Sequence, residues 1–90
     1  MSDAWHWEYD PDEMHVTDGI PVDVIAEVER LADQLTELAD MGVDIGELGM
    51  GPRPGGLRYM DAAGGWFHYL ASPRDRIMVV VRIVPPVQNL

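Results

Sequence analysis

Residues 76–84, Arg-Ile-Met-Val-Val-Val-Arg-Ile-Val, constrain the fold of this chain more than any other stretch. Valine and isoleucine favour an extended backbone, and the two prolines that follow at 85–86 cannot donate the hydrogen bonds that would continue a sheet. The run therefore predicts one long strand that ends at about Val84. The upstream part of the chain is expected to cover this strand.

Two shorter strands are expected directly before it, at residues 57–61 and 66–71. They are separated by a turn at residues 62–65, Ala-Ala-Gly-Gly, and a second turn follows at residues 72–75, Ser-Pro-Arg-Asp. Proline in the second position of the latter, with serine and aspartate at the ends, is typical of a type I turn. These signals predict a three-stranded antiparallel meander.

The N-terminal residues 4–10 alternate aromatic and polar side chains, which indicates a strand with Trp5, Trp7 and Tyr9 on one face. His6 and His15 lie among acidic residues here, but their spacing matches no metal motif. A solvated acidic segment is the preferred interpretation of this region, and a metal cluster is the alternative.

A long helix is expected from about Pro21 to about Met41. Proline is acceptable in the first turn of a helix, and Gly42 can end it in a left-handed conformation. Apolar residues recur at steps of four and three along the segment, at Val24, Val28, Leu31, Leu35 and Leu38. This stripe predicts burial against the sheet, in preference to a coiled-coil seam.

The expected fold class is therefore α+β: a small antiparallel sheet, made of the N-terminal strand and the C-terminal meander, packed against one long helix. Ninety residues form a single domain, 1–90, and without cysteine it must rely on a hydrophobic core. The longest apolar run, residues 77–81, is too short to span a membrane. We expect no membrane association and a cytoplasmic location.

Charge is divided unevenly along the chain. Residues 1–51 hold 14 acidic side chains and one arginine, a net of −13, whereas residues 52–90 hold two acidic side chains and five arginines, a net of +3. Such asymmetry suggests surfaces with different partners. Every positive charge is an arginine, whose planar fork suits carboxylate or phosphate, although a GC-rich genome would also explain the missing lysines.

Four-residue turns at both hairpins would determine which side chains share a face. One face would carry Arg58, Met60, Phe67, Tyr69, Met78, Val80 and Arg82. The other would carry Leu57, Tyr59, Trp66, His68, Leu70, Ile77, Val79, Val81 and Ile83. We expect the second set to pack on the helix, which places His68 in the core. The first set then forms an outward arginine face.

Further arginines are expected near this face. Arg76 would lie at its rim, and the glycine-rich segment 42–56, read as a flexible loop, would bring Arg53 toward the sheet. The expected binding residues are therefore Arg53, Arg58, Tyr69, Arg76 and Arg82. No metal or cofactor is expected, because no phosphate-loop or metal-ligand pattern is present.

The order of these features resembles the RelE/ParE family of small bacterial toxins. The similarity includes the aromatic first strand, the helix, a Gly-Leu-Arg sequence that places Arg58 at the start of a strand, and the Gly-Gly-aromatic turn into residues 66–69. It implies helices over one face of an antiparallel sheet. It also implies, for the ribonuclease members, cleavage of messenger RNA on the ribosome by arginines, lysines and a terminal Tyr or His.

The resemblance is partial, because Pro85-Pro86 and a four-residue tail stand where the family has a terminal His or Tyr. The favoured hypothesis is a toxin-family-like protein that pairs with a small antitoxin-like partner, or with itself, without catalysis. The long apolar edge strand would also offer a site for strand addition. The alternative is a ribosome-associated mRNA endoribonuclease with Arg58, Tyr69 and Arg82 as candidate catalytic residues, with RNA on the arginine face and His68 as a possible base. A third interpretation, in which Arg58 and Arg82 only form salt bridges with the acidic half, stays open.

Overall fold

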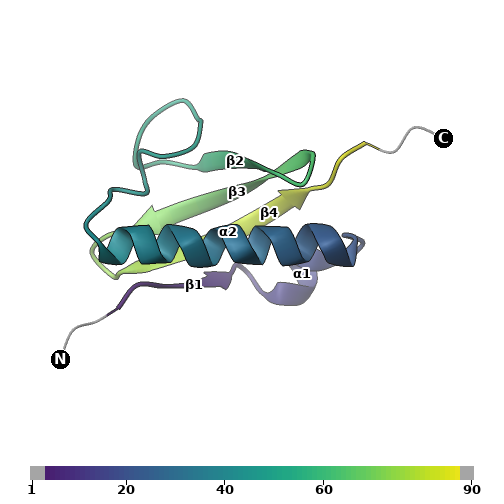
Figure 1. Cartoon of the computed structure of the whole chain (residues 1–90), viewed down its shortest axis with the longest axis horizontal. Coiled ribbons are helices and arrows are strands. Elements are labelled where there is room, and N and C mark those ends of the chain that lie inside the picture. The colour runs from purple at the N-terminus through teal and green to yellow at the C-terminus, as the bar shows by residue number, and fades with distance from the viewer. Residues whose placement is uncertain (1–3, 88–90) are drawn as a thin grey trace.

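A computed structural model of the chain describes residues 4–87, and it places the β-branched run inside a four-stranded sheet (Figure 1). The strands are β1 (His6–Tyr9), β2 (Arg58–Ala62), β3 (Gly65–Ser72) and β4 (Ile77–Val84). They lie in the order β1-β4-β3-β2. A short helix α1 (Glu13–Thr17) and a long helix α2 (Val22–Asp40) connect β1 to the loop that precedes β2.

The predicted α+β class, with a C-terminal meander and one long helix, is confirmed. The sheet is mixed, however, because β1 pairs with β4 in parallel while the other two pairings are antiparallel. This pairing places β4 in the interior of the sheet. The expected strand-addition site on the long apolar strand is therefore wrong, since β1 and β2 are the two edges.

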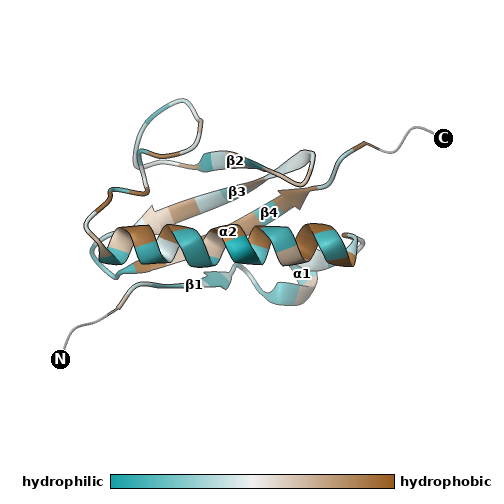
Figure 2. Ribbon diagram, in the orientation of Figure 1, coloured by the Kyte–Doolittle hydropathy of each residue, from teal (hydrophilic) through white to brown (hydrophobic). Residues whose placement is uncertain are grey.

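Helix α2 packs on one face of the sheet, close to its predicted bounds. Its buried side chains are Val24, Val28, Ala32, Leu35, Thr36 and Ala39. Three members of the predicted stripe are among them, whereas Leu31 is half-buried and Leu38 is 36% exposed. Gly42 follows with φ of 95°, the left-handed conformation expected at the helix end. Figure 2 shows the contrast between β4, which is apolar apart from Arg82, and α2, where apolar and polar residues alternate.

The β2–β3 hairpin has the predicted register with a shorter turn. Ala62 pairs with Gly65, so only Ala63 and Gly64 form the loop, and both have positive φ, 51° and 83°. Two successive left-handed residues are typical of a type I′ turn, whose twist matches that of the strands. Arg58 therefore faces Tyr69, as expected from the sequence.

The β3–β4 register differs from the expected one in two ways. Tyr69 pairs with Val80 instead of Met78, a shift of two residues that leaves the faces unchanged. A bulge between His68 and Tyr69 then adds one residue on β4. Because side chains alternate along a strand, the extra residue turns every later side chain of β4 to the other face.

The predicted assignment of faces is wrong. The set expected to face outward is the one that packs on α2, with Phe67, Tyr69, Met78 and Val80 each 0% exposed. Ile83, expected on the other face, joins this core because it follows the bulge. In a regular strand Arg82 would share a face with Met78 and Val80, so the pattern of β4 favoured the other face for the core, and the assumption that Arg58 faces water supported the same wrong choice.

Helix α1 was not expected from the sequence. Asp12 begins it as the N-cap, with its carboxylate accepting from the backbone N–H of His15 at 2.9 Å, and Val16 is its buried residue. In the described part of the chain, no helix combines the length and hydropathy that crossing a lipid bilayer requires.

Candidate functional site

Arg58 is buried beneath the loop between α2 and β2. Only 5% of its surface is exposed, and its guanidinium donates three hydrogen bonds to backbone carbonyls of the loop. Nε donates to Leu48 O at 3.0 Å, Nη1 to Arg53 O at 2.9 Å and Nη2 to Gly49 O at 3.0 Å. The planar fork of arginine thus holds the loop against the sheet, and each of its three nitrogens donates to the loop in place of the expected anion.

Tyr69 holds the same loop from the core. Its hydroxyl lies 3.0 Å from the carbonyl oxygens of both Ile45 and Leu48 and donates to them. Burial raises the pKa of Tyr69 to about 12, although the nearby Arg58 lowers it. The hydroxyl is therefore neutral at physiological pH, and it is enclosed within the fold together with Arg58.

The predicted arginine face does not form. Arg82 is exposed on the opposite side of the sheet from Arg58, because the bulge reverses the end of β4. Arg53 is exposed in the loop, and Arg76 is exposed just before β4, with φ of 52° and its carbonyl accepting from His6 N–H. The structure brings together only Arg58 and Tyr69 from this predicted set, and it does so in the interior.

The other face of the sheet, which we call the open face, carries side chains that sequence reasoning had placed in the core. They are Tyr59, Trp66, His68, Leu70, Ile77 and Val79. Arg82, which was expected on the outward face, joins them, and none of the seven is buried. Trp66 is 40% exposed and Leu70 is 39% exposed. None of the apolar residues of the open face belongs to the core cluster beneath α2. The result is an accessible surface that is mostly apolar and aromatic.

One row across the open face combines three polar or aromatic groups. His68 pairs with Tyr59 on one side and with Arg82 on the other, and the rings of His68 and Tyr59 lie 5.8 Å apart. Burial and the Arg82 guanidinium lower the pKa of His68. A neutral histidine beside an arginine could accept a proton near a bound anion. The bulge that places Arg82 here left no signal in the sequence.

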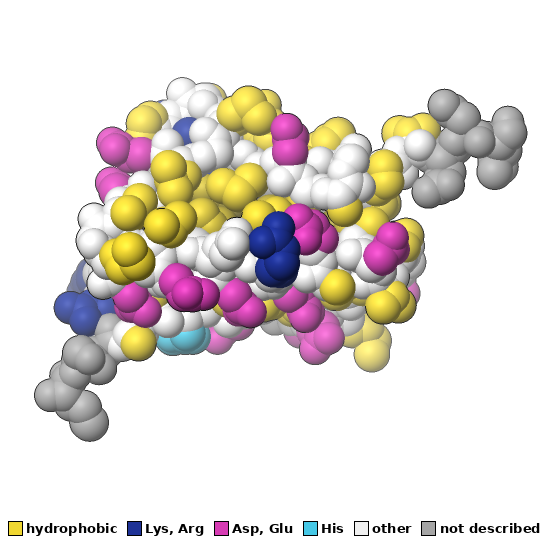
Figure 3. Space-filling model, viewed as in Figure 1, with side chains coloured by type: hydrophobic (Ala, Val, Ile, Leu, Met, Phe, Trp, Pro, Cys, Tyr) yellow, Lys and Arg dark blue, Asp and Glu magenta, His cyan; other side chains and the backbone are white. Residues whose placement is uncertain are grey.

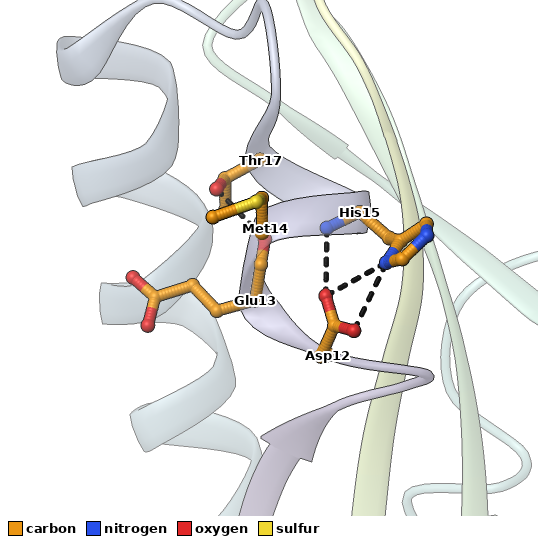
Figure 4. Close-up of a pocket in the computed structure, with 5 residues that line it drawn as sticks. All are labelled: Asp12, Glu13, Met14, His15 and Thr17. Carbon is orange, nitrogen blue, oxygen red and sulfur yellow. Dashed lines mark hydrogen bonds and ion pairs between the residues drawn. The ribbon is translucent and has the colours of Figure 1, made fainter.

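A recess lies beside α1, and two residues of its lining, Asp12 and His15, are hydrogen-bonded to each other. Its volume is about 590 Å³ and its lining is Asp12, Glu13, Met14, His15 and Thr17. Figure 4 shows Asp12 and His15 turned toward each other while Glu13 points away. The His15 backbone and side chain lower the pKa of the Asp12 carboxyl. Among residues 4–87, no group of three or more His, Asp or Glu side chains is arranged to hold a metal ion.

The sheet has two edges, and they differ in access. The outer side of β2 is partly occupied, because Met50 and Tyr59 exchange two backbone hydrogen bonds of 2.8 Å. The outer side of β1 has no neighbouring strand among the residues that the structure describes. Edges of this kind are sites where another chain can pair.

Comparisons with known proteins add no family. Neither a family model, nor a curated protein, nor a solved structure matches the chain.

Proposed function

We propose that this chain is a protein-binding domain related to the RelE/ParE toxins, and that it pairs with a small partner protein without catalysing a reaction. The observation that carries the proposal is the open face, where Trp66 and Leu70 are about two-fifths exposed among half-buried aliphatic side chains. Exposed apolar patches of this kind typically mark protein-interaction sites. The resemblance to a toxin family supplies the class of partner, a short antitoxin-like protein.

The roles of Arg58 and Tyr69 also support binding over catalysis. Both were candidates for contact with RNA, yet all of their polar groups are directed to the carbonyl oxygens of the loop. Releasing them would open the loop and leave buried polar groups without partners, which is costly. Their role is therefore to hold the loop that covers the end of the core.

The test uses two leucines of similar exposure on opposite sides of the molecule. Leu70→Glu places a charge on the open face, whereas Leu38→Glu places the same charge on α2, where Leu38 is 36% exposed. Each variant is co-expressed with the product of the adjacent reading frame, and the dissociation constant is measured by titration calorimetry. The mass of the chain alone is measured by light scattering to detect pairing with itself.

We expect Leu70→Glu to weaken pairing by at least about a hundredfold, because it introduces a charge into an apolar interface, and Leu38→Glu to have little effect. Equal affinity of the wild type and Leu70→Glu would contradict the proposal. So would a wild-type chain that neither binds the adjacent product nor pairs with itself.

A second candidate function, cleavage of messenger RNA on the ribosome, is favoured by the row formed by Tyr59, His68 and Arg82. Arg82 would bind phosphate, His68 would accept the proton of the attacking hydroxyl, and Tyr59 would stack on a base. The net charge of −10 opposes this function, because ribosomal RNA repels an acidic protein.

Induction of the wild type, His68→Gln and Arg82→Gln in a bacterial host separates the two functions. Growth arrest with new 5′ ends in messages, lost in both variants, would support cleavage. Arrest without new ends would support a protein target.

A further inference from the structure

The outer edge of β1 has backbone groups directed away from the sheet. In a parallel pair, the N–H and C=O of alternate residues bond to the neighbouring strand, and those between them point outward. His6 N–H donates to Arg76 O and Asp10 N–H donates to Val80 O, which identifies the residues that bond to β4. The backbone groups of Trp7 and Tyr9 therefore point outward, where another strand could pair with them.

Helix α2 places a line of carboxylates along the same strand. Asp40 accepts from the Trp5 backbone N–H, Asp33 from Trp7 Nε1 and Glu29 from the Tyr9 hydroxyl, each at 2.8 Å. Each donor is neutral, so none of the three contacts is an ion pair. Figure 3 shows the resulting row of acidic side chains along one side of α2, next to β1.

A recess follows the edge itself. It has a volume of about 570 Å³, and its lining is Trp7, Glu8, Tyr9, Glu13 and Glu29. The recess lies beside β1, and its lining also includes one residue of α1 and one of α2. Three of its five lining residues are acidic, and in residues 4–87 none of these three is in an ion pair with an arginine.

Burial, the hydrogen bond to Glu29 and the negative charges of Glu29 and Glu13 raise the pKa of Tyr9 well above its usual range. The direction of this shift agrees with a negative potential along the edge, which would attract arginine and lysine side chains.

We propose that the outer edge of β1 receives an extended, arginine- or lysine-rich segment of the partner protein as an additional strand. This inference rests on the proposed function, because it specifies the chemistry of one segment of the partner. Pairing of strands would supply backbone hydrogen bonds, and alternate side chains of the segment would meet the carboxylates of α2 and Glu8 on the other face. The edge of a second copy fits poorly, because it would bring two acidic rows together.

The experiment uses two capped synthetic peptides of about seven residues, close to the usual length of a strand. One alternates arginine with valine, and the other alternates glutamate with valine. Binding to the whole chain is measured by titration calorimetry, and amide hydrogen exchange is followed by NMR. We expect the arginine peptide to bind and the glutamate peptide not to bind.

Hydrogen exchange distinguishes pairing of the peptide as a strand from binding through charge alone. The amides of Trp7 and Tyr9 should gain protection in the complex, whereas His6 and Glu8, which lie on the side of β4, should keep the protection that they already have. A peptide that binds through charge alone would not protect alternate amides.

Paired charge variants test the role of the carboxylates. Glu29→Gln with Asp33→Asn removes two charges while keeping an oxygen that can accept from Tyr9 and Trp7. We expect affinity for the arginine peptide to fall about fivefold, in line with the modest energy of solvent-screened charge pairs. The control is Glu47→Gln with Asp61→Asn, which removes two charges near the opposite edge of the sheet and should change the affinity little.

Three results would overturn the inference: equal binding of the two peptides, no binding of the arginine peptide at millimolar concentration, or protection that appears at Trp66 and Leu70 instead of Trp7 and Tyr9. The last result would still agree with the proposed function, because it would place the peptide on the open face. Failure of the proposed function is detected separately, through the Leu70→Glu variant and the co-expressed partner.

Discussion

The side chains of Arg58 and Tyr69 hold the long loop between α2 and β2 in place. Five hydrogen bonds from these two residues reach carbonyls of Ile45, Leu48, Gly49 and Arg53. The loop is rich in glycine but contributes Ile45, which is 1% exposed, to the core, and the buried polar contacts add to that packing. An arginine with no carboxylate partner is stable in this position because three carbonyl dipoles surround its charge.

Removal of the Tyr69 hydroxyl should therefore destabilise the protein. We expect Tyr69→Phe to lower the free energy of unfolding by about 1 kcal/mol, because the buried hydrogen bonds of the hydroxyl are lost while Ile45 O and Leu48 O each keep one other donor. Tyr59→Phe is the matched control, since the Tyr59 ring contacts His68 on the open face, and it should change stability by less than about 0.5 kcal/mol. Urea unfolding measures both, and equal effects of the two substitutions would contradict the assigned role of Tyr69.

The titration of His68 should reduce stability at mildly acidic pH. Burial and Arg82 lower its pKa in the folded chain, so the unfolded chain binds the proton more tightly. Stability is then full above the ordinary pKa of about 6.5 and falls as pH decreases through that value toward the lower folded pKa. Arg82→Gln should raise the pKa of His68, as measured by NMR titration, and should make stability less dependent on pH between about 5 and 7. An unchanged pKa of His68 in the variant would contradict the electrostatic effect of Arg82 on His68.

At the scale of elements, the bulge in β4 decides which side chains share a face. It reverses the alternation between Val80 and Ile83, so Ile83 is 5% exposed and Arg82 is exposed. A regular strand would put Arg82 into the core beside Val80. The bulge therefore keeps a charged side chain out of the core and adds a hydrophobic one to it.

Two alanine substitutions test this arrangement. We expect Ile83→Ala to lower the free energy of unfolding by about 2–4 kcal/mol, because it removes a buried aliphatic side chain. Arg82→Ala should stay within about 0.5 kcal/mol of the wild type, since Arg82 lies at the surface. Denaturant unfolding compares the two, and a larger loss for Arg82→Ala would mean that β4 runs without the bulge.

For the whole molecule, the dominant feature is the uncompensated negative charge. The chain has a net charge of −10, and Arg30 forms an ion pair with Glu27 at 2.7 Å. This pair lies on α2 at the surface and contributes little to the stability of the fold. Mutual repulsion among the carboxylates of α2, α1 and β1 therefore opposes folding, and a basic partner segment along β1 would relieve it.

Salt should accordingly stabilise the free protein. Raising sodium chloride from low concentration to about 0.3 M should raise the melting temperature by about 5 °C, the change that roughly 1 kcal/mol produces in a small domain. Circular dichroism measures the melting temperature. The Glu29→Gln and Asp33→Asn double variant should respond less to salt, and a melting temperature that falls with salt would show that ion pairs dominate instead.

Local patterns in the sequence determined most of the elements. The β-branched run, the stripe of the long helix, the glycine at its end and the β2–β3 pairing are properties of neighbouring residues, and each was predicted close to its observed position. The short helix α1 escaped prediction because its five residues carry only one buried side chain, Val16.

Only the tertiary structure decided the faces and therefore the candidate site. In β4, the local pattern places Arg82 on the same face as Met78 and Val80, so it predicts the wrong side for the core. A single extra residue at the bulge then separates Arg58 from Arg82, and the backbone carbonyls of a distant loop make burial of Arg58 favourable. Such contacts depend on residues far apart in the chain, and for that reason the elements could be predicted while the surface that they present could not.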